Sequence, residues 1–156
     1  MKLLPDALLV LLLYAPICSI AQVQNNGNLR MHQGSEIGFF GNFSNKGTFT
    51  NNMGTLHAVG SDAQTFNGTN PIQAKNFTIN KSSNALQVDN VLQIVGELTF
   101  ANGIILTDRV DIATEFVDFL DGASHAGASN DSHIDGVIRK TGKDNFVFPT
   151  GDNAIL

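Results

Sequence analysis

The sequence predicts an all-β protein folded as a right-handed parallel β-helix or solenoid-like coil, with an antiparallel β-sandwich as the alternative. Three features of the stretch 40–56 (FGNFSNKGTFTNNMGTL) carry this prediction. Its apolar segments are short, its Phe and Thr residues suit a half-buried strand, and Asn and Gly between them tolerate the left-handed backbone of a tight corner. Because such short strands bury too little surface to be stable alone, similar segments must stack on either side of them.

Strand-like segments follow one another along the chain. We expect strands at 37–40, 47–50, 55–59, 64–66, 76–80, 86–88, 91–95, 97–100 and 104–107. The separators between them consist largely of Asn, Gly, Ser and Pro, which is the composition of turns.

Two topologies fit these segments. Asn102-Gly103 is a strong signal for a two-residue hairpin, which would suit an antiparallel sandwich. The solenoid is favoured because the segments within 40–56 are too short to pair usefully as hairpins. Stacked Asn side chains at the corners would also form ladders along a coil.

Alternation of apolar and polar residues predicts one buried face for each strand, as with Phe77 and Ile79 in 76–80. The predicted core consists of Phe43, Phe49, Leu56, Phe66, Phe77, Ile79, Leu86, Val88, Leu92, Ile94, Leu98, Phe100, Ile104 and Leu106.

After residue 107, the regular succession of short strands and turns is expected to end. Segment 110–120 has some apolar residues at helical spacing, but Thr114, Phe116 and Val117 favour a strand, which is the prediction here. Residues 121–131 are predicted to be a loop and 132–156 a C-terminal strand segment. Since no closing element precedes the end of the sequence, we expect a fragment of a longer protein.

Residues 1–21 have the plan of a secretory signal peptide. A positive charge at Lys2 precedes an apolar run at 7–17, and small residues precede a cleavage point before Gln22. The apolar run is shorter than the roughly 20 residues of a membrane span, so no span is expected in the mature chain. Residues 22–33 are predicted to form a polar lead-in that caps the first open strand edge, ahead of a solenoid-like domain at 34–120.

Composition excludes some partners. Cleavage of the signal peptide would remove Cys18, the one cysteine, so the exported domain would have no disulfide, which indicates bacterial export. The formal net charge of −5 is spread along the chain, and no basic face is evident. We therefore expect no nucleic-acid partner.

The acidic residues give no clear catalytic pair. Polysaccharide cleavage needs two carboxyl groups about 5 to 9.5 Å apart, which on one strand means positions i and i+2. Asp108 with Asp111, and Asp118 with Asp121, are instead three apart and would lie on opposite faces. Pairs formed across coils are invisible in the sequence, so the prediction is a solvated surface and no catalytic residue.

The other candidate groups are equally weak. The densest cluster has His133 between Asp131 and Asp135, with His125 upstream, and a surface loop explains it better than a calcium or zinc site. The remaining candidates are His32, His57, the pair Arg139-Lys140, and the serines Ser124, Ser129 and Ser132. The basic pair is expected to be solvent-facing rather than an anion or glycan contact, and no Gly-x-Ser-x-Gly elbow frames a serine. We predict no metal and no cofactor.

Segment 130–152 (NDSHIDGVIRKTGKDNFVFPTGD) resembles a segment found repeatedly in large exported surface proteins of Bacteroidetes. Their pattern is approximately Ser-aromatic-Val-x-Gly-x-Val-x-Lys-x-Gly, followed by Phe-x-Phe-Pro-x-Gly. His133 stands in the place of the usual aromatic residue. The matching residues are Ser132, Ile134, Gly136, Ile138, Lys140, Gly142, Phe146, Phe148, Pro149 and Gly151. With the upstream Asn/Gly coils, the resemblance extends over roughly 34–152.

The resemblance implies an adhesin-like repeat protein that leaves the cell by the type IX secretion route and is secreted or held on the outer surface. The expected function is a structural module without catalytic activity, with surface glycans or neighbouring cells as partners besides the export machinery. A polysaccharide-active lyase or hydrolase built on the same coil is the alternative.

Overall fold

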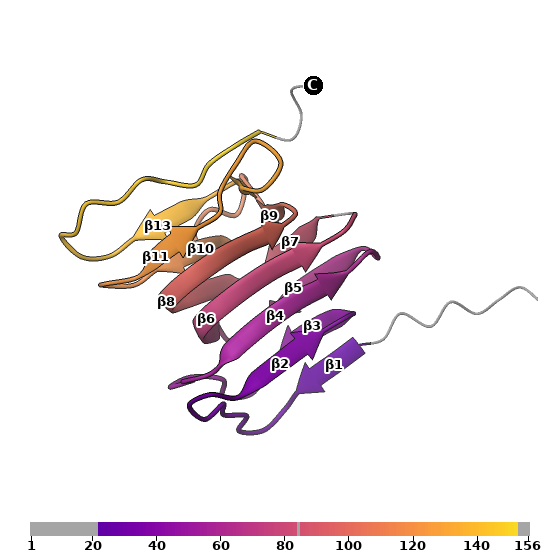
Figure 1. The fold of residues 1–156 in the computed structure, drawn as a ribbon. Coiled ribbons are helices and arrows are strands. Elements are labelled where there is room, and N and C mark those ends of the chain that lie inside the picture. Colours follow the sequence, from indigo (N-terminus) through magenta and orange to yellow (C-terminus); the bar gives the residue numbers. More distant parts are fainter. Residues whose placement is uncertain (1–21, 84, 153–156) are drawn as a thin grey trace, which may run out of the picture.

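The structure is a computed structural model that describes residues 22–83 and 85–152. These residues form an all-β parallel solenoid of about 6 turns, and no helix occurs among them. Coils succeed one another from the indigo end at β1 to the yellow end at β13 (Figure 1). The predicted solenoid is confirmed. The sandwich alternative is wrong, because all ladders between the named strands are parallel.

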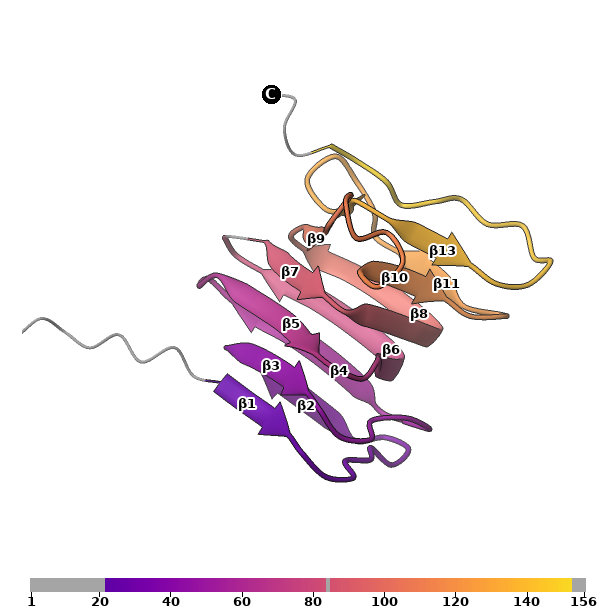
Figure 2. The ribbon, with the colours of Figure 1, turned by 180° about the vertical axis from the view of Figure 1, so that it is seen from behind.

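The strands alternate between two sheets. The first sheet has the order β1 (Gln22–Asn25), β3 (Asn42–Asn45), β5 (Gln64–Gly68), β7 (Leu86–Asp89), β9 (Ile105–Thr107) and β12 (Ile134–Asp135). The second has the order β13 (Ile138–Lys140), β10 (Phe116–Phe119), β8 (Val91–Asn102), β6 (Ile72–Lys81), β4 (Thr55–Gly60) and β2 (Glu36–Phe39), and β11 (Ser124–Ala126) also pairs with β8. Seen from behind, the same order of coils continues from β1 to β13 (Figure 2).

The long strands β6 and β8 each extend over two adjacent faces of the coil. Their mutual register shifts between Ala74 and Asn76, and such an irregularity bends a strand. On its other edge, β8 pairs with β10 before this bend and with β11 after it. The second sheet therefore has two faces, and each middle coil has three sides.

Twelve of the fourteen predicted core residues are buried, with Phe100 at 4% exposure and the others at 0%. The prediction is wrong for Ile104 and Leu106, which are half-buried, while Ile105 and Thr107 point inward. The turn after β8 shifts the alternation by one residue, and Ile105 then aligns with Leu86 of the coil below. A one-residue slip exchanges the two faces of a strand, so the sequence pattern alone misplaced this one.

The strand boundaries also differ in places. The segment predicted at 47–50 is not a named strand; β3 precedes it, and Thr48 forms an isolated parallel bridge with Asn28. The two strands predicted at 91–95 and 97–100 form the single strand β8. In segment 110–120, the strand β10 begins only at Phe116.

The ranges expected for other parts of the chain contain strands of their own. Residues 22–33 include β1, which pairs with β3, and residues 121–131 include β11. The predicted signal peptide at 1–21 lies outside the described residues.

Asparagine side chains connect the coils at the corner after the first sheet. Buried Asn25 donates from Nδ2 to Oδ1 of Asn45 at 2.8 Å. Asn45 donates in turn to the carbonyl oxygens of Asn70 and Pro71, at 3.2 and 2.8 Å. Asn90 in the next coil donates to the Asn70 carbonyl at 2.7 Å. These bonds satisfy corner backbone groups that no sheet pairs, which is the reason for the Asn-rich separators.

The opposite corner holds a buried lysine. Lys81 is 1% exposed, and its Nζ donates to the Asp62 carbonyl at 2.7 Å and to Oε1 of Gln64 at 3.4 Å. Gln64 itself donates to the carbonyl of Phe39 at 2.9 Å. Burial lowers the pKa of Lys81, and the nearby charge of Asp62 opposes that effect.

Candidate functional site

A cavity of about 690 Å³ lies at the C-terminal end of the stack. It is bounded by β11, by the segment 128–133 and by the segment 147–152. These segments belong to the last coils, where the connections between strands are long. The cavity therefore lies where the regular stacking of strands gives way to loops.

The predicted cluster of histidines and aspartates is only partly assembled here. His125, His133 and Asp131 line the cavity. Asp135 does not; it pairs with Arg109 and lines a second, shallower hollow with Gln87. The alternation that would have placed Asp131, His133 and Asp135 on one side is broken, because β12 begins only at Ile134.

Three ring nitrogens of the cavity histidines have no hydrogen-bond partner. They are Nδ1 of His125 and both nitrogens of His133, and all three are buried. Nε2 of His125 lies 2.6 Å from the Val147 carbonyl, so this nitrogen carries the proton that is donated. Buried polar atoms are nearly always paired in folded proteins, so this concentration of unpaired nitrogens requires an explanation.

Gly151 closes directly over the ring of His133. A Cβ atom at position 151 would lie 2.3 Å from Cδ2 and 2.5 Å from Nε2 of His133. Two backbone hydrogen bonds with Ile134 hold the segment there. The Ile134 N–H donates to the Pro149 carbonyl at 2.8 Å, and the Gly151 N–H donates to the Ile134 carbonyl at 3.1 Å. Any larger residue at 151 would displace the imidazole ring.

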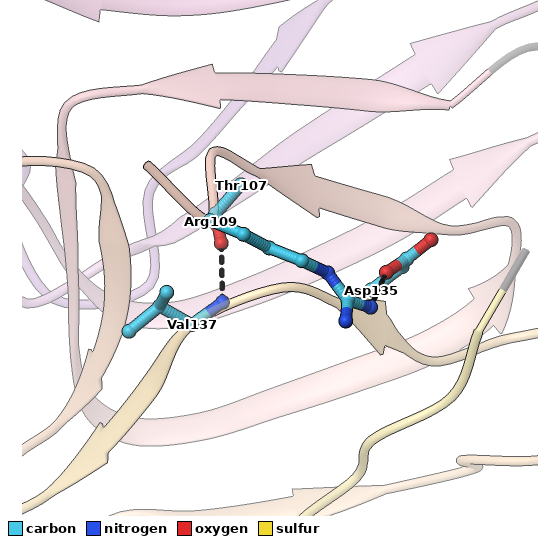
Figure 3. A network of polar contacts seen from close by, with 4 residues as sticks. All are labelled: Thr107, Arg109, Asp135 and Val137. Atoms are coloured by element: carbon cyan, nitrogen blue, oxygen red, sulfur yellow. Dashed lines mark hydrogen bonds and ion pairs between the residues drawn. The ribbon is translucent and has the colours of Figure 1, made fainter. Parts of the chain in front are cut away.

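A polar network fastens β12 and the turn before β13 to the preceding coil (Figure 3). The Val137 N–H donates to Oγ1 of Thr107 at 2.6 Å, and Arg109 forms an ion pair with Asp135. Asp135, through its hydrogen bond and its charge, raises the pKa of Arg109, with a smaller contribution from Asp152 at the cavity. Gly136 is needed at this turn because its φ is +139° and a Cβ would meet Thr107 Oγ1 at 2.2 Å.

Asp108 and Asp111, the first acidic pair considered in the sequence, form separate backbone contacts rather than facing each other as two carboxyl groups. Asp108 accepts from the Val110 N–H at 2.6 Å, and the Asp111 carbonyl begins a turn by accepting from the Thr114 and Glu115 N–H groups. Burial raises the pKa of Glu115, followed by the charges of Asp89, Asp108 and Asp111. Asp89, which belongs to an earlier coil, and Glu115 therefore influence each other through their charges.

Asp118 lies in an outward column of polar side chains. In register it has Gln93 on one side and Arg139 on the other. Burial raises the pKa of Asp118, while a hydrogen bond with Gln93 and the charge of Arg139 oppose that shift. Its partners across the coils are thus an amide and a guanidinium rather than a second carboxyl group.

The basic pair and Ser132 make contacts within the chain. Arg139 places its guanidinium carbon 3.7 Å from the ring centroid of Phe116 and donates to the Ile112 carbonyl at 2.8 Å. Lys140 Nζ donates to the Leu120 carbonyl at 3.1 Å. Ser132 is buried, and its hydroxyl accepts from the Gly103 N–H at 3.1 Å.

Two features of the cavity were missed in the sequence. Phe148, Pro149 and Gly151 were identified only as matches to a surface-protein pattern, yet they form one wall of the cavity. Asp152 also lines it. The signal was the Phe-x-Phe-Pro-x-Gly motif itself, since a Pro and a Gly at fixed positions usually serve a backbone requirement.

Within 22–83 and 85–152, no group of three or more His, Cys, Asp or Glu side chains is placed to hold a metal ion. A search of the same residues finds no helix with the length and apolar character needed to cross a membrane. No family model, curated protein or solved structure matches this chain.

Proposed function

We propose that this chain is a secreted or cell-surface structural module, adhesin-like and without catalytic activity of its own, which presents the outer face of its coils to glycans or neighbouring cells. The observation that carries the proposal is the outward face of β4, β6 and β8. On this face, polar and small side chains from successive coils stand in register.

Two columns make up this face. The first runs through Glu36, Thr55, Asn76, Glu97 and Ser124, and the second through Gly38, His57, Thr78, Thr99 and Ala126. Neighbouring strands are about 4.8 Å apart, so the face repeats hydroxyl, amide and carboxylate groups at that interval. A rigid, periodic surface of hydrogen-bonding groups suits contact with an extended polymer. The resemblance to exported surface proteins supports the same function.

The proposal is tested with residues 22–156 coupled to fluorescent beads and incubated with a panel of bacterial cells and insoluble polysaccharides. We expect bead retention on at least one surface and no release of reducing ends from it. The variant with Thr78→Glu and Thr99→Glu, which are cross-coil neighbours, should lose retention. The matched control carries Thr65→Glu and Gln87→Glu, cross-coil neighbours on the first sheet, and should retain it. Equal retention by both variants, or by neither, would contradict the proposal.

A polysaccharide-active enzyme remains the second candidate, and one observation favours it. Burial and the nearby charges of Asp89, Asp108 and Asp111 raise the pKa of Glu115, and a carboxyl group that holds its proton more tightly than usual suits the general acid of glycoside cleavage. Reducing-end release by the parent chain and its loss in Glu115→Gln would establish this alternative. Release that is unchanged in Glu115→Gln would place any activity elsewhere.

A further inference from the structure

We propose that the open edge of the first coil that the structure describes is the interface through which two copies of this chain form a symmetric dimer. This first-coil edge consists of the free sides of β1 and β2, with Gly27 between the two strands. In the dimer, β1 and β2 of one copy pair antiparallel with the same strands of the other. The inference goes beyond the proposed function, which concerns the outer face of β4, β6 and β8.

Both sheets end at this edge with unpaired backbone groups. β1 and β2 are terminal in their sheets, and within 22–83 and 85–152 no strand lies beyond them. The Ser35 carbonyl accepts from the Thr55 N–H at 2.9 Å, which fixes the alternate residues of β2 that face β4. The N–H and carbonyl groups of Glu36 and Gly38, and by the same alternation those of Gln24 in β1, therefore face away from the stack. Such a row of free groups is a template for pairing with another chain.

The hydrophobic core is also open at this end. Val23 continues the inward column of Phe43 and Phe66, which are both fully buried, yet Val23 is 49% exposed. Ile37 continues the inward column of Leu56 and is only partly buried. A second copy placed against the first-coil edge would remove these side chains from water, and this burial favours association.

Two glycines at the edge leave room for a second backbone. In the next coil, a Cβ on Gly47 would lie 2.1 Å from the Gly27 carbonyl oxygen, so the coil packed against Gly47 requires a glycine there. Gly27 is the counterpart of Gly47 one coil earlier, and a Cβ on Gly27 would have nothing within 4 Å. A Cβ on Gly38 would make only ordinary contacts, at 3.9 Å. Neither Gly27 nor Gly38 has a positive φ, and a glycine in a strand often marks the close approach of another backbone.

The C-terminal end of the stack does not offer a matching edge. There the N–H and carbonyl groups of Ile134 in β12 bond to Pro149 and Gly151 of the same chain. The yellow segment after β13 runs across this end of the stack (Figure 1). Continuation of the stack from the first coil of one copy to the last coil of another is therefore blocked.

The distribution of charge favours contact between two first coils. Besides histidines, residues 22–60 carry the charged side chains of Arg30, Glu36 and Lys46, whereas residues 108–152 carry nine acidic and four basic side chains. Two copies that meet through their first coils keep their acidic last coils far apart. A two-fold axis then pairs each edge strand with its own copy and closes the assembly at two chains. Pairing through β2 also joins the two second sheets, so the outer faces of both copies form one longer face.

The experiment is sedimentation equilibrium of residues 22–156, which contain every strand that the structure describes. Over about 1 to 200 µM we expect a reversible monomer–dimer equilibrium with a Kd of about 10 µM or tighter. Gly38→Pro removes an N–H that faces the open edge and places a ring there, and symmetry repeats the loss in the second copy. This variant should weaken association about tenfold or more, while the dilute protein melts close to the parent.

Phe40 and Phe148 give a matched pair of variants at opposite ends of the stack. Phe40 is 73% exposed and lies against Gly38, and Phe148 is 48% exposed on the C-terminal segment. Phe40→Ser should weaken association, whereas Phe148→Ser should leave the Kd unchanged. The Thr78→Glu/Thr99→Glu variant should still dimerise, so failure of the dimer and failure of the proposed function are seen separately.

Amide hydrogen exchange locates the interface. The Glu36 and Gly38 amides should exchange slowly in the dimer and rapidly after dilution below the Kd, whereas exchange in β6 should not depend on concentration. The proposal is overturned if the protein is monomeric at about 200 µM, if it forms open-ended oligomers, or if neither Gly38→Pro nor Phe40→Ser weakens association. Should Gly38→Pro fail to fold, the Phe40→Ser and Phe148→Ser pair decides. Because a dimer adds distances between copies, any spin-label distance within one copy is measured with labelled chain diluted in unlabelled chain.

Discussion

The middle coils and the last coils of this solenoid are built from the same kind of strand, yet they differ in regularity. From β4 to β9 the inward residues are almost completely buried, and short corners join the strands. After β9, long segments at 108–115 and 127–133 separate the strands. Val117, Phe119 and Ile134 are still fully buried there, but Ile138 and Phe146 are only partly buried. Regular stacking therefore buries the core of the protein, whereas the departures from it form the cavity beside His125 and His133.

The cause of this difference is visible in the pairing between coils. In the middle, Val88 aligns with Thr107 after one short circuit of the chain. In the last coils, Ile105 aligns with Ile134 after a much longer one. The extra residues have no strand partners of their own, so they must find hydrogen bonds in turns and side chains. The Thr107 and Arg109 network in Figure 3 is one such substitute.

The largest effect is expected from a charge placed in the core of a middle coil. Phe77→Asp should prevent folding, because an unpaired buried carboxylate costs several kcal/mol against a total stability of about 5 to 15 kcal/mol. Phe146→Asp, at a half-buried position in the last coil, should leave the middle coils folded. Circular dichroism during heating measures both. A Phe77→Asp variant that melted with the parent would refute the assignment of the core.

The corner ladder should produce the next largest effect. Asn45→Ala removes a fully buried side chain that joins three coils, and we expect a loss of about 3 kcal/mol in the free energy of unfolding because its partners are left unpaired. Asn80→Ala, on the exposed side of β6, should change it by less than about 0.5 kcal/mol. Urea unfolding of both variants tests this. Equal losses would mean that the ladder does not contribute as inferred.

A smaller and more local effect is expected at the junction with the last coils. Thr107→Val keeps the volume of this buried side chain but removes the acceptor for the Val137 N–H, at a cost of about 1 to 2 kcal/mol. Hydrogen exchange should become faster in 134–140 and remain unchanged in 55–100. Uniform acceleration in both regions would show that the last coils do not open separately.

The smallest effect concerns pH and the middle coils. Burial lowers the pKa of Lys81 below its ordinary value of 10.5, so the unfolded chain binds more protons between the lowered and the ordinary pKa. The free energy of unfolding contributed by this group therefore rises with pH across that interval. Relative to Lys81→Met, the parent chain should gain stability as the pH rises toward the ordinary lysine pKa of 10.5. A parallel pH dependence in the two proteins would contradict the effect of burial.

The sequence was informative where the pattern was regular. Alternating residues such as Phe77 and Ile79 predicted the buried face, and the Asn-rich separators predicted a ladder at the corners. The pattern misled at Ile104 and Leu106, because a single extra residue in a turn reverses which side chains point inward. The cavity was beyond prediction for a different reason: His125, His133 and Phe148 are brought together by the path of the long connections, and no local propensity determines that path.

The stacking of coils in register is tested most directly by a distance measured along the stack. Glu36 and Ser124 are exposed and lie in one column, four strand-to-strand steps apart through Thr55, Asn76 and Glu97. At about 4.8 Å for each step, their Cα atoms should be roughly 19 Å apart. Spin labels on Glu36→Cys and Ser124→Cys in residues 22–156, measured by double electron–electron resonance, should give a narrow distribution near that distance. A broad distribution, or one centred beyond about 30 Å, would contradict the in-register stack.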